Sequence, residues 1–126
     1  MAISFAGGSC HSAGVAVLGE ESALKIGDSI IIEGEELQIK FLEVTGDSRC
    51  PKGVTCIWAG EVSCMVEIKY QESINRLTLT QPGSTDWPPE RSFREYKLAY
   101  HVEPYPVAGA EISEDEYRLH LTVVKR

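Results

Sequence analysis

The amino-acid sequence predicts an all-β fold, an antiparallel β-sandwich of about six or seven strands with immunoglobulin-like features; a small open barrel is the alternative. Apolar residues recur at every second position through most of the chain, which is the period of a strand with one buried face. Turn-forming residues separate these stretches, and no stretch shows a convincing helical period. The length of 126 residues matches one domain and suffices to bury a hydrophobic core.

The chain divides into a short N-terminal segment and a single domain. Residues 1–14 are rich in glycine and serine, so we predict a flexible segment there. Residues 15–126 are predicted to form the β domain. Its first strand is expected at the apolar run Ser29–Ile32, and Glu33 with Gly34 forms a tight turn after it.

The central part of the sequence predicts three further strands. In the strand that starts at Leu37 the apolar phase shifts by one residue, which predicts a β-bulge near Phe41 and Leu42. Strands over 60–70 and 74–80, with a turn between them, are expected to form a hairpin.

Two strands are predicted in the C-terminal part. Proline and glycine are dense over 81–91, which predicts a long loop. A strand is expected over 93–103 and a last one over 117–123. Between them, residues near Ser113 are compatible with one short helical turn that this serine caps.

The four cysteines fall into two groups. Cys50 and Cys56 enclose a turn-rich spacer with a proline and a glycine, which favours a disulfide; two unpaired thiols of a cytosolic protein are the alternative. Cys64 lies in the inward phase of a predicted strand, so we expect a buried free thiol. Cys10 is left open: it pairs with Cys64, carries a lipid, or is free.

The segment 44–60, which reads VTGDSRCPKGVTCIWAG, resembles a group of uncharacterised bacterial exported proteins and lipoproteins that share a DSRCP stretch followed by C-x-W-A-G. The residues Glu103–Pro104–Tyr105–Pro106 and Asp115–Glu116–Tyr117–Arg118 fit the later part of that pattern. The resemblance implies export and an oxidised Cys50–Cys56 pair, and it implies no reaction.

Charge and hydropathy exclude several classes of partner. The net charge is −7 and no run of basic residues exceeds two, so nucleic-acid binding and binding to an anionic membrane surface are not expected. No apolar run approaches the roughly 20 residues that cross a bilayer as a helix. We expect a monomer in the periplasm or at the cell surface, with a lipid anchor as an alternative. The N-terminus shows no complete leader, so either a native leader has been removed or export is not used.

Catalysis and metal binding are both weakly indicated. His11, His101 and His120 are the only histidines, and no G-x-S-x-G nucleophile elbow is present, so a hydrolase is a distant third hypothesis. We predict no cofactor and no metal, with exposed histidines. The alternative is a copper-type envelope protein in which His101 and His120 lie side by side on neighbouring strands; Cys10, His11 and Met65 would add soft ligands.

The favoured hypothesis is a non-catalytic binding domain whose loops hold a protein or a cell-surface ligand. Its candidate anchors are Trp58, Trp87, Tyr105 and Arg49, since aromatic residues and arginine near loops are typical of interfaces. For Trp58 the competing prediction is a ring packed on the disulfide. For Arg49 it is a local ion pair with Asp47 that shapes the loop.

Overall fold

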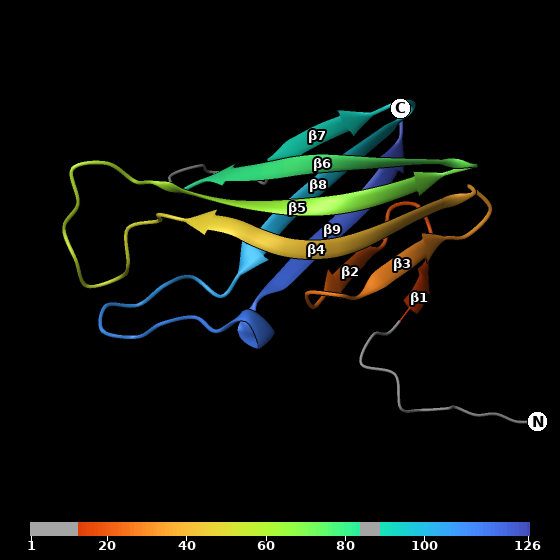
Figure 1. The fold of residues 1–126 in the computed structure, drawn as a ribbon. Coiled ribbons are helices and arrows are strands. Elements are labelled where there is room, and N and C mark those ends of the chain that lie inside the picture. The colour runs from red at the N-terminus through yellow and green to blue at the C-terminus, as the bar shows by residue number, and fades with distance from the viewer. Residues whose placement is uncertain (1–12, 84–88) are drawn as a thin grey trace, which may run out of the picture.

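The computed structural model describes residues 13–83 and 89–126, and in this part of the chain nine strands form two sheets that are not closed into a barrel (Figure 1). The predicted all-β sandwich is confirmed. The elements are β1 (Ala13–Ala16), β2 (Glu21–Leu24), β3 (Ser29–Ile32), β4 (Leu37–Asp47), β5 (Glu61–Tyr70), β6 (Ser73–Pro82), β7 (Glu90–Phe93), β8 (Tyr96–Glu103), the 3₁₀ helix η1 (Glu114–Glu116) and β9 (Arg118–Lys125).

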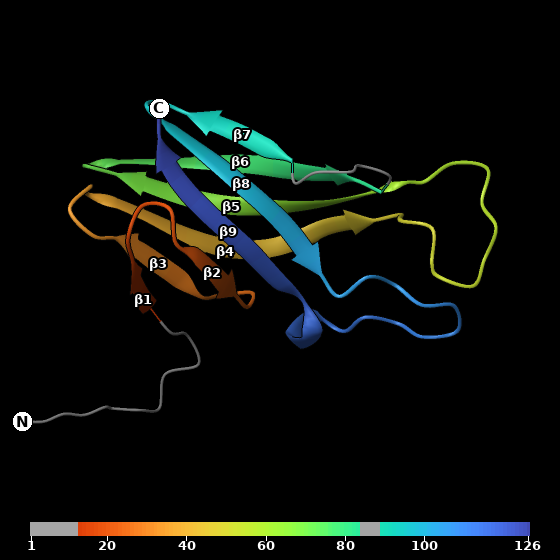
Figure 2. The same cartoon turned by 180° about the vertical axis from the view of Figure 1, so that it is seen from behind.

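The two sheets differ in size, with five strands in one and four in the other. One sheet has the order β1-β3-β4-β5-β6, and the other has the order β2-β9-β8-β7. All pairs are antiparallel except β1 with β3, which run parallel. The crossing of β8 and β9 over β4, β5 and β6 is visible from both sides in Figures 1 and 2.

The core lies between the sheets, where alternate residues of each long strand meet. On β5, Val62, Cys64, Val66 and Ile68 are fully buried, and on β9 the same holds for Leu119 and Leu121. These residues follow the two-residue period of the sequence, because successive side chains of a strand point to opposite faces. The free Cys64 thiol is part of this core, and burial raises its pKa to about 12, so it is not a reactive nucleophile.

Several local predictions are confirmed. The register of β4 against β5 shifts between Phe41 and Glu43, which is the predicted bulge, and it shifts again between Val44 and Gly46. β5 and β6 form the expected hairpin. Ser113 and Glu116 form a capping box on η1.

Other boundaries differ from the prediction. The strand expected over 93–103 begins only at Tyr96, as β8, because Arg94 has a φ of 55° and the chain turns there. The loop predicted over 81–91 is shorter than expected, because β6 continues to Pro82 and β7 begins at Glu90. β1 and β2 were not expected; β1 begins at Ala13, inside the segment that was predicted to be flexible. The rest of that prediction, for residues 1–12, lies outside the described residues.

Polar contacts join the sheets at the end that carries the turn between β3 and β4. The Tyr96 hydroxyl donates a hydrogen bond to Glu35 Oε1 over 2.9 Å, and Lys125 Nζ lies 3.0 Å from the same oxygen. The hydrogen bond from Lys125, and then that from Tyr96, hold the pKa of Glu35 below its usual value. The opposite end of the sandwich is closed by a different network, described below.

Candidate functional site

Two loops leave the same end of the sandwich and lie side by side (Figures 1 and 2). One joins β4 to β5 and carries the disulfide, and the other joins β8 to β9. The backbones pair at Lys52: its amide donates to the Pro106 carbonyl over 3.0 Å, and the Ala108 amide donates to the Lys52 carbonyl over 3.0 Å. These backbone hydrogen bonds hold the loops together beyond the last strands.

Arg49 lies beneath these loops and is 4% exposed. Its Nε and Nη2 atoms donate to the two carboxylate oxygens of Asp47, each over 2.8 Å. The same guanidinium donates to the carbonyl of Val102 over 3.2 Å and to that of Pro104 over 3.0 Å. Arg49 therefore connects the end of β4 in one sheet to the end of β8 in the other. The predicted Asp47 pair exists, but it is buried and not a surface contact.

Asp47 receives a further hydrogen bond from the four-stranded side. The Tyr117 hydroxyl, just before β9, donates to Asp47 Oδ2 over 2.9 Å. Burial alone would raise the pKa of Asp47, but the hydrogen bonds from Arg49 and Tyr117 outweigh it and hold the pKa below the usual value. Burial and the Asp47 carboxylate raise the pKa of Tyr117 to about 12, so this hydroxyl stays a donor.

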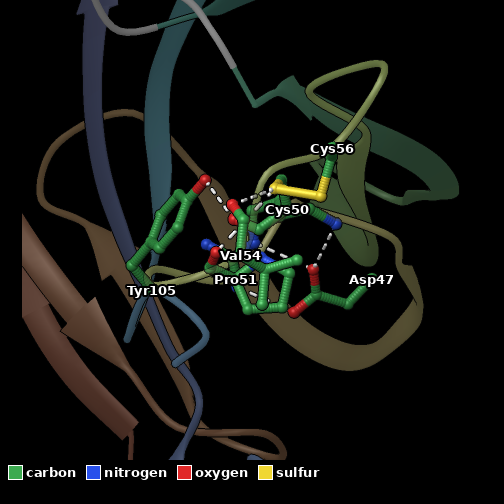
Figure 3. The surroundings of a disulfide bond; sticks show 7 residues. Asp47, Cys50, Pro51, Val54, Cys56 and Tyr105 are labelled. Carbon is green, nitrogen blue, oxygen red and sulfur yellow. Dashed lines mark hydrogen bonds and ion pairs between the residues drawn. A yellow bond between two sulfur atoms is a disulfide. The ribbon is translucent and has the colours of Figure 1, made fainter. Parts of the chain in front are cut away.

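The predicted disulfide between Cys50 and Cys56 is present, with the two Cα atoms 6.0 Å apart. Tyr105 supports it from the neighbouring loop, since its hydroxyl donates to the Cys50 carbonyl over 2.8 Å. Tyr105 and Asp47 flank Cys50 from opposite sides in Figure 3. The Tyr105 ring also lies near two cations, with Arg49 Cζ 5.3 Å and Lys52 Nζ 5.9 Å from its centroid. Tyr105 therefore braces the loops.

We expect reduction of the disulfide to lower the free energy of unfolding by roughly 2 kcal/mol, because the bond closes a short loop in the unfolded chain. Urea unfolding with and without a reductant measures this. A Cys64→Ala variant is the control, since Cys64 is unpaired and should leave the difference between the two conditions unchanged. Identical midpoints in the two conditions would contradict the prediction.

Above this support, apolar side chains point into solvent. Ile57 is 93% exposed and Trp58 is 69% exposed, both just after the disulfide, and Val54 and Val107 are also exposed. We call these four residues the loop-end surface. The prediction that Trp58 is a buried ring packed on the disulfide is wrong, because its side chain is mostly in solvent.

A groove of about 450 Å³ lies beside the loop-end surface, and Arg49, Asp47 and Tyr117 are among its lining residues, with Pro51 and Pro106 from the two loops. A larger groove, of about 560 Å³, lies at the opposite end and is lined mainly by polar residues such as Glu36, Lys69 and Glu72. Ile31 is an exposed apolar side chain in the larger groove, but only the smaller of these two grooves lies between the paired loops, so we include that one in the candidate site.

The structure also brings the two histidines of the metal hypothesis together. The rings of His101 on β8 and His120 on β9 stack with centroids 4.5 Å apart, next to Glu21 on β2. Both histidines are half-buried, where exposure was expected. Met65 cannot join them, because it points outward from the other sheet between the buried Cys64 and Val66.

Three candidate site residues lie outside the part of the chain that is described: Cys10, His11 and Trp87. Sequence reasoning missed Ile57, Val54, Val107 and Glu21 as site residues. Ile57 carries a signal in hindsight, because an apolar pair after a disulfide loop is unusual unless it is buried or binds something. Glu21 carries none, since only the pairing of β2 with β9 brings it near the histidines.

The fold and loops define an all-β sandwich with a disulfide-anchored, partly apolar loop end. No protein-family model, no curated protein and no solved structure matches the chain. In the described part, the sole helical segment is η1, so no helix there could cross a membrane. Functional inference therefore depends on the geometry of the candidate sites.

Proposed function

We propose that this protein is a non-catalytic, extracytoplasmic binding domain whose loop-end surface holds a protein partner. The observation that carries the proposal is the exposure of Ile57 and Trp58, two large adjacent apolar side chains, at the tip of a braced loop. Tryptophan is among the residues that most often anchor protein interfaces. Fully burying a side chain of this kind gains roughly 2 kcal/mol in transfer free energy, which gives a partner a reason to cover it.

Preorganisation supports the same proposal. The disulfide, the Tyr105 hydroxyl and the backbone pairing at Lys52 hold the loops that present Ile57 and Trp58. A loop that is already ordered loses less conformational entropy when a partner binds, so more of the contact energy appears as affinity. The aromatic and arginine residues that were first considered as ligand anchors, Tyr105 and Arg49, act in this proposal as support for the exposed pair.

The proposed location follows from the redox chemistry of the loop. A disulfide persists in oxidising compartments such as the periplasm or the cell surface and is rare in the cytosol. The Cys50–Cys56 pair is compatible with such a compartment, and the resemblance to exported bacterial proteins points to the same place. The net charge of −7 favours solubility there and disfavours nucleic-acid partners.

Site-specific photo-crosslinking in the cells that produce the protein tests this proposal. A photo-crosslinking amino acid in place of Ile57 is expected to trap one defined partner protein. The matched control replaces Ile74, which is 61% exposed on β6 at the opposite end of the sandwich. Adducts that form equally from both positions would contradict the proposal. Adducts between two copies of this chain would also contradict it and would assign the surface to self-association.

The Trp58→Ser substitution should separate binding from folding. Because Trp58 is largely exposed, we expect the free energy of unfolding to change by no more than about 0.5 kcal/mol, as at most surface positions. Crosslinking from a neighbouring loop position, Val54, should fall at least severalfold. Urea unfolding and the yield of the adduct measure the two effects. A large loss of stability would mean that the indole is part of the core, and an unchanged yield would remove Trp58 as an anchor.

A further inference from the structure

We propose that Glu21, His101 and His120 form a binding site for a divalent transition metal ion, of which Zn²⁺ and Cu²⁺ are the best-suited examples. The site lies on the outer face of the four-stranded sheet. It does not depend on the loop-end surface, because none of its residues belongs to that surface. It is the only cluster among the described residues in which three or more His, Cys, Asp or Glu side chains converge closely enough to hold a metal.

Strand register places the three residues together. His101 on β8 is directly opposite His120 on β9, so their side chains project from the same face. β2 pairs with the other edge of β9, where Glu21 is opposite Thr122. Glu21 is therefore the diagonal neighbour of His120, two residues along on the same face. Three adjacent strands each supply one ligand, so the sheet backbone fixes their spacing.

The distances are close to those of a metal site. Glu21 Oε2 lies 3.7 Å from His120 Nδ1 and 3.9 Å from His101 Nδ1, and one ligand atom from each residue falls within 4.8 Å of the others. Tetrahedral zinc with bonds of about 2.0–2.1 Å keeps its donors roughly 3.3 Å apart. The carboxylate has to approach each ring by about half an ångström, and the two stacked imidazoles have to turn so that their nitrogens, which are within 4.8 Å, close by as much as about 1.5 Å; rotation of these side chains supplies this movement.

Glu103 gives His101 the orientation that a ligand needs. Its Oε2 atom lies 3.4 Å from His101 Nε2, on the side of the ring away from Glu21. Histidines that bind a metal through one nitrogen usually present the other N–H to a carboxylate, which fixes the tautomer and the ring position. Glu103 is thus a positioning residue that favours the proton on Nε2 and leaves Nδ1 free for the metal.

The charge around the cluster favours a cation. Glu21 and Glu103 contribute two carboxylates, and the cation Arg118 is opposite Glu103 on β9. The Arg118 guanidinium donates to the carbonyls of Asp115 and Tyr117. Two imidazoles and one carboxylate form a nitrogen–oxygen donor set that suits Zn²⁺ and, by its higher intrinsic affinity, Cu²⁺. Three protein ligands leave at least one position for water.

Isothermal titration calorimetry with ZnCl₂ tests the proposal. The full chain with Cys10→Ser and His11→Ala is the parent, so that these N-terminal donors contribute no binding. We expect one Zn²⁺ per chain. His101→Ala and His120→Ala should each weaken binding by about tenfold or more, and Glu103→Gln should weaken it by a smaller factor. Histidine ring ¹⁵N spectra should show zinc-dependent shifts of Nδ1 in both rings.

A matched control and the apo proteins complete the test. Glu90→Gln removes an exposed carboxylate from β7 of the same sheet and should leave the affinity unchanged. Without zinc, the histidine variants should melt at the temperature of the parent, which excludes misfolding as the cause of lost binding. Zinc binding that survives His120→Ala would overturn the proposal, as would the absence of any zinc binding by the parent protein. Either result leaves the loop-end proposal unaffected.

Discussion

Arg49→Ala is expected to lower the free energy of unfolding by about 3–5 kcal/mol, because it leaves the largely buried Asp47 carboxylate without its counter-ion. The substitution also removes the donors to the carbonyls of Val102 and Pro104. Urea unfolding followed by circular dichroism measures the loss. The control is Arg76→Ala, whose partner Glu67 is 3.9 Å away and whose side chain is mostly exposed, and it should change stability by no more than about 0.5 kcal/mol.

Two further variants show whether the paired charge is responsible. Arg49→Lys keeps the charge but not the planar fork that binds both oxygens of Asp47, so an intermediate loss is expected. The double variant Asp47→Asn with Arg49→Met removes both charges and should cost less than the sum of the single changes. Additive losses, or a loss below about 1 kcal/mol for Arg49→Ala, would mean that the network does not join the sheets energetically.

The Arg49–Asp47 pair should also make stability depend on pH in the acid range. Since the pKa of Asp47 is lower in the folded state, its contribution is fully present above its unfolded pKa of about 3.9 and is lost as the pH falls through the folded value. The parent protein should therefore lose stability below about pH 4 more steeply than Arg49→Ala, in which this contribution is already missing. If the free energy of unfolding of the two proteins fell equally steeply below about pH 4, the role assigned to the Asp47 carboxylate would be wrong.

Gly60→Ala is expected to destabilise the fold by about 2–4 kcal/mol. Gly60 has a φ of 74°, in the left-handed region that other L-residues rarely adopt, and a Cβ atom there would collide with the Ser48 carbonyl oxygen. The collision is with backbone, so the base of the disulfide loop has to move. That base is held by two backbone hydrogen bonds, Ser48 to Glu61 over 2.7 Å and Cys50 to Ala59 over 3.0 Å.

Gly46→Ala is the matched control for this prediction. Gly46 lies on β4 close to the same loop, but it has no positive φ and a Cβ atom there would meet nothing within 4 Å. The free energy of unfolding of the Gly46→Ala variant should change little or rise slightly, because alanine restricts the conformations of the unfolded chain. The melting temperatures of the two variants are compared with that of the parent. Equal shifts would mean that the positive φ of Gly60 does not require glycine. The result also tests why glycine ends the W-A-G stretch at Gly60.

The long strands were predictable because each alternates its side chains between core and solvent. On β5 and β9 the apolar period alone selects the buried residues, and the structure buries those same residues. The short edge strands β1, β2 and β7 were missed for a physical reason. Each has only four residues, too few for a period to emerge, and their strand conformation comes from pairing with β3, β9 and β8.

At the loop end, too, local features were predictable from the sequence and long-range contacts were not. The Cys50–Cys56 disulfide follows from a short spacer that contains a proline and a glycine, so local sequence was enough. The environment of Arg49 was not local: its carbonyl partners lie more than 50 positions away in sequence, at the end of β8 and just after it. The exposure of Trp58 was not predictable from its place two residues after Cys56, a position that had favoured packing on the disulfide.

The sequence by itself determined the all-β class, the buried face of each long strand, the bulge near Phe41 and the loop disulfide, because these depend on neighbours in the chain. Apart from the β5–β6 hairpin, tertiary structure decided which strands share a sheet, and it brought Glu21 to the two histidines, buried Arg49 and left Ile57 and Trp58 exposed. The metal-ligand cluster depends on register between strands that are distant in sequence, because a one-residue slip would move its side chains to the other face. The burial of Arg49 depends on contacts with residues more than 50 positions away.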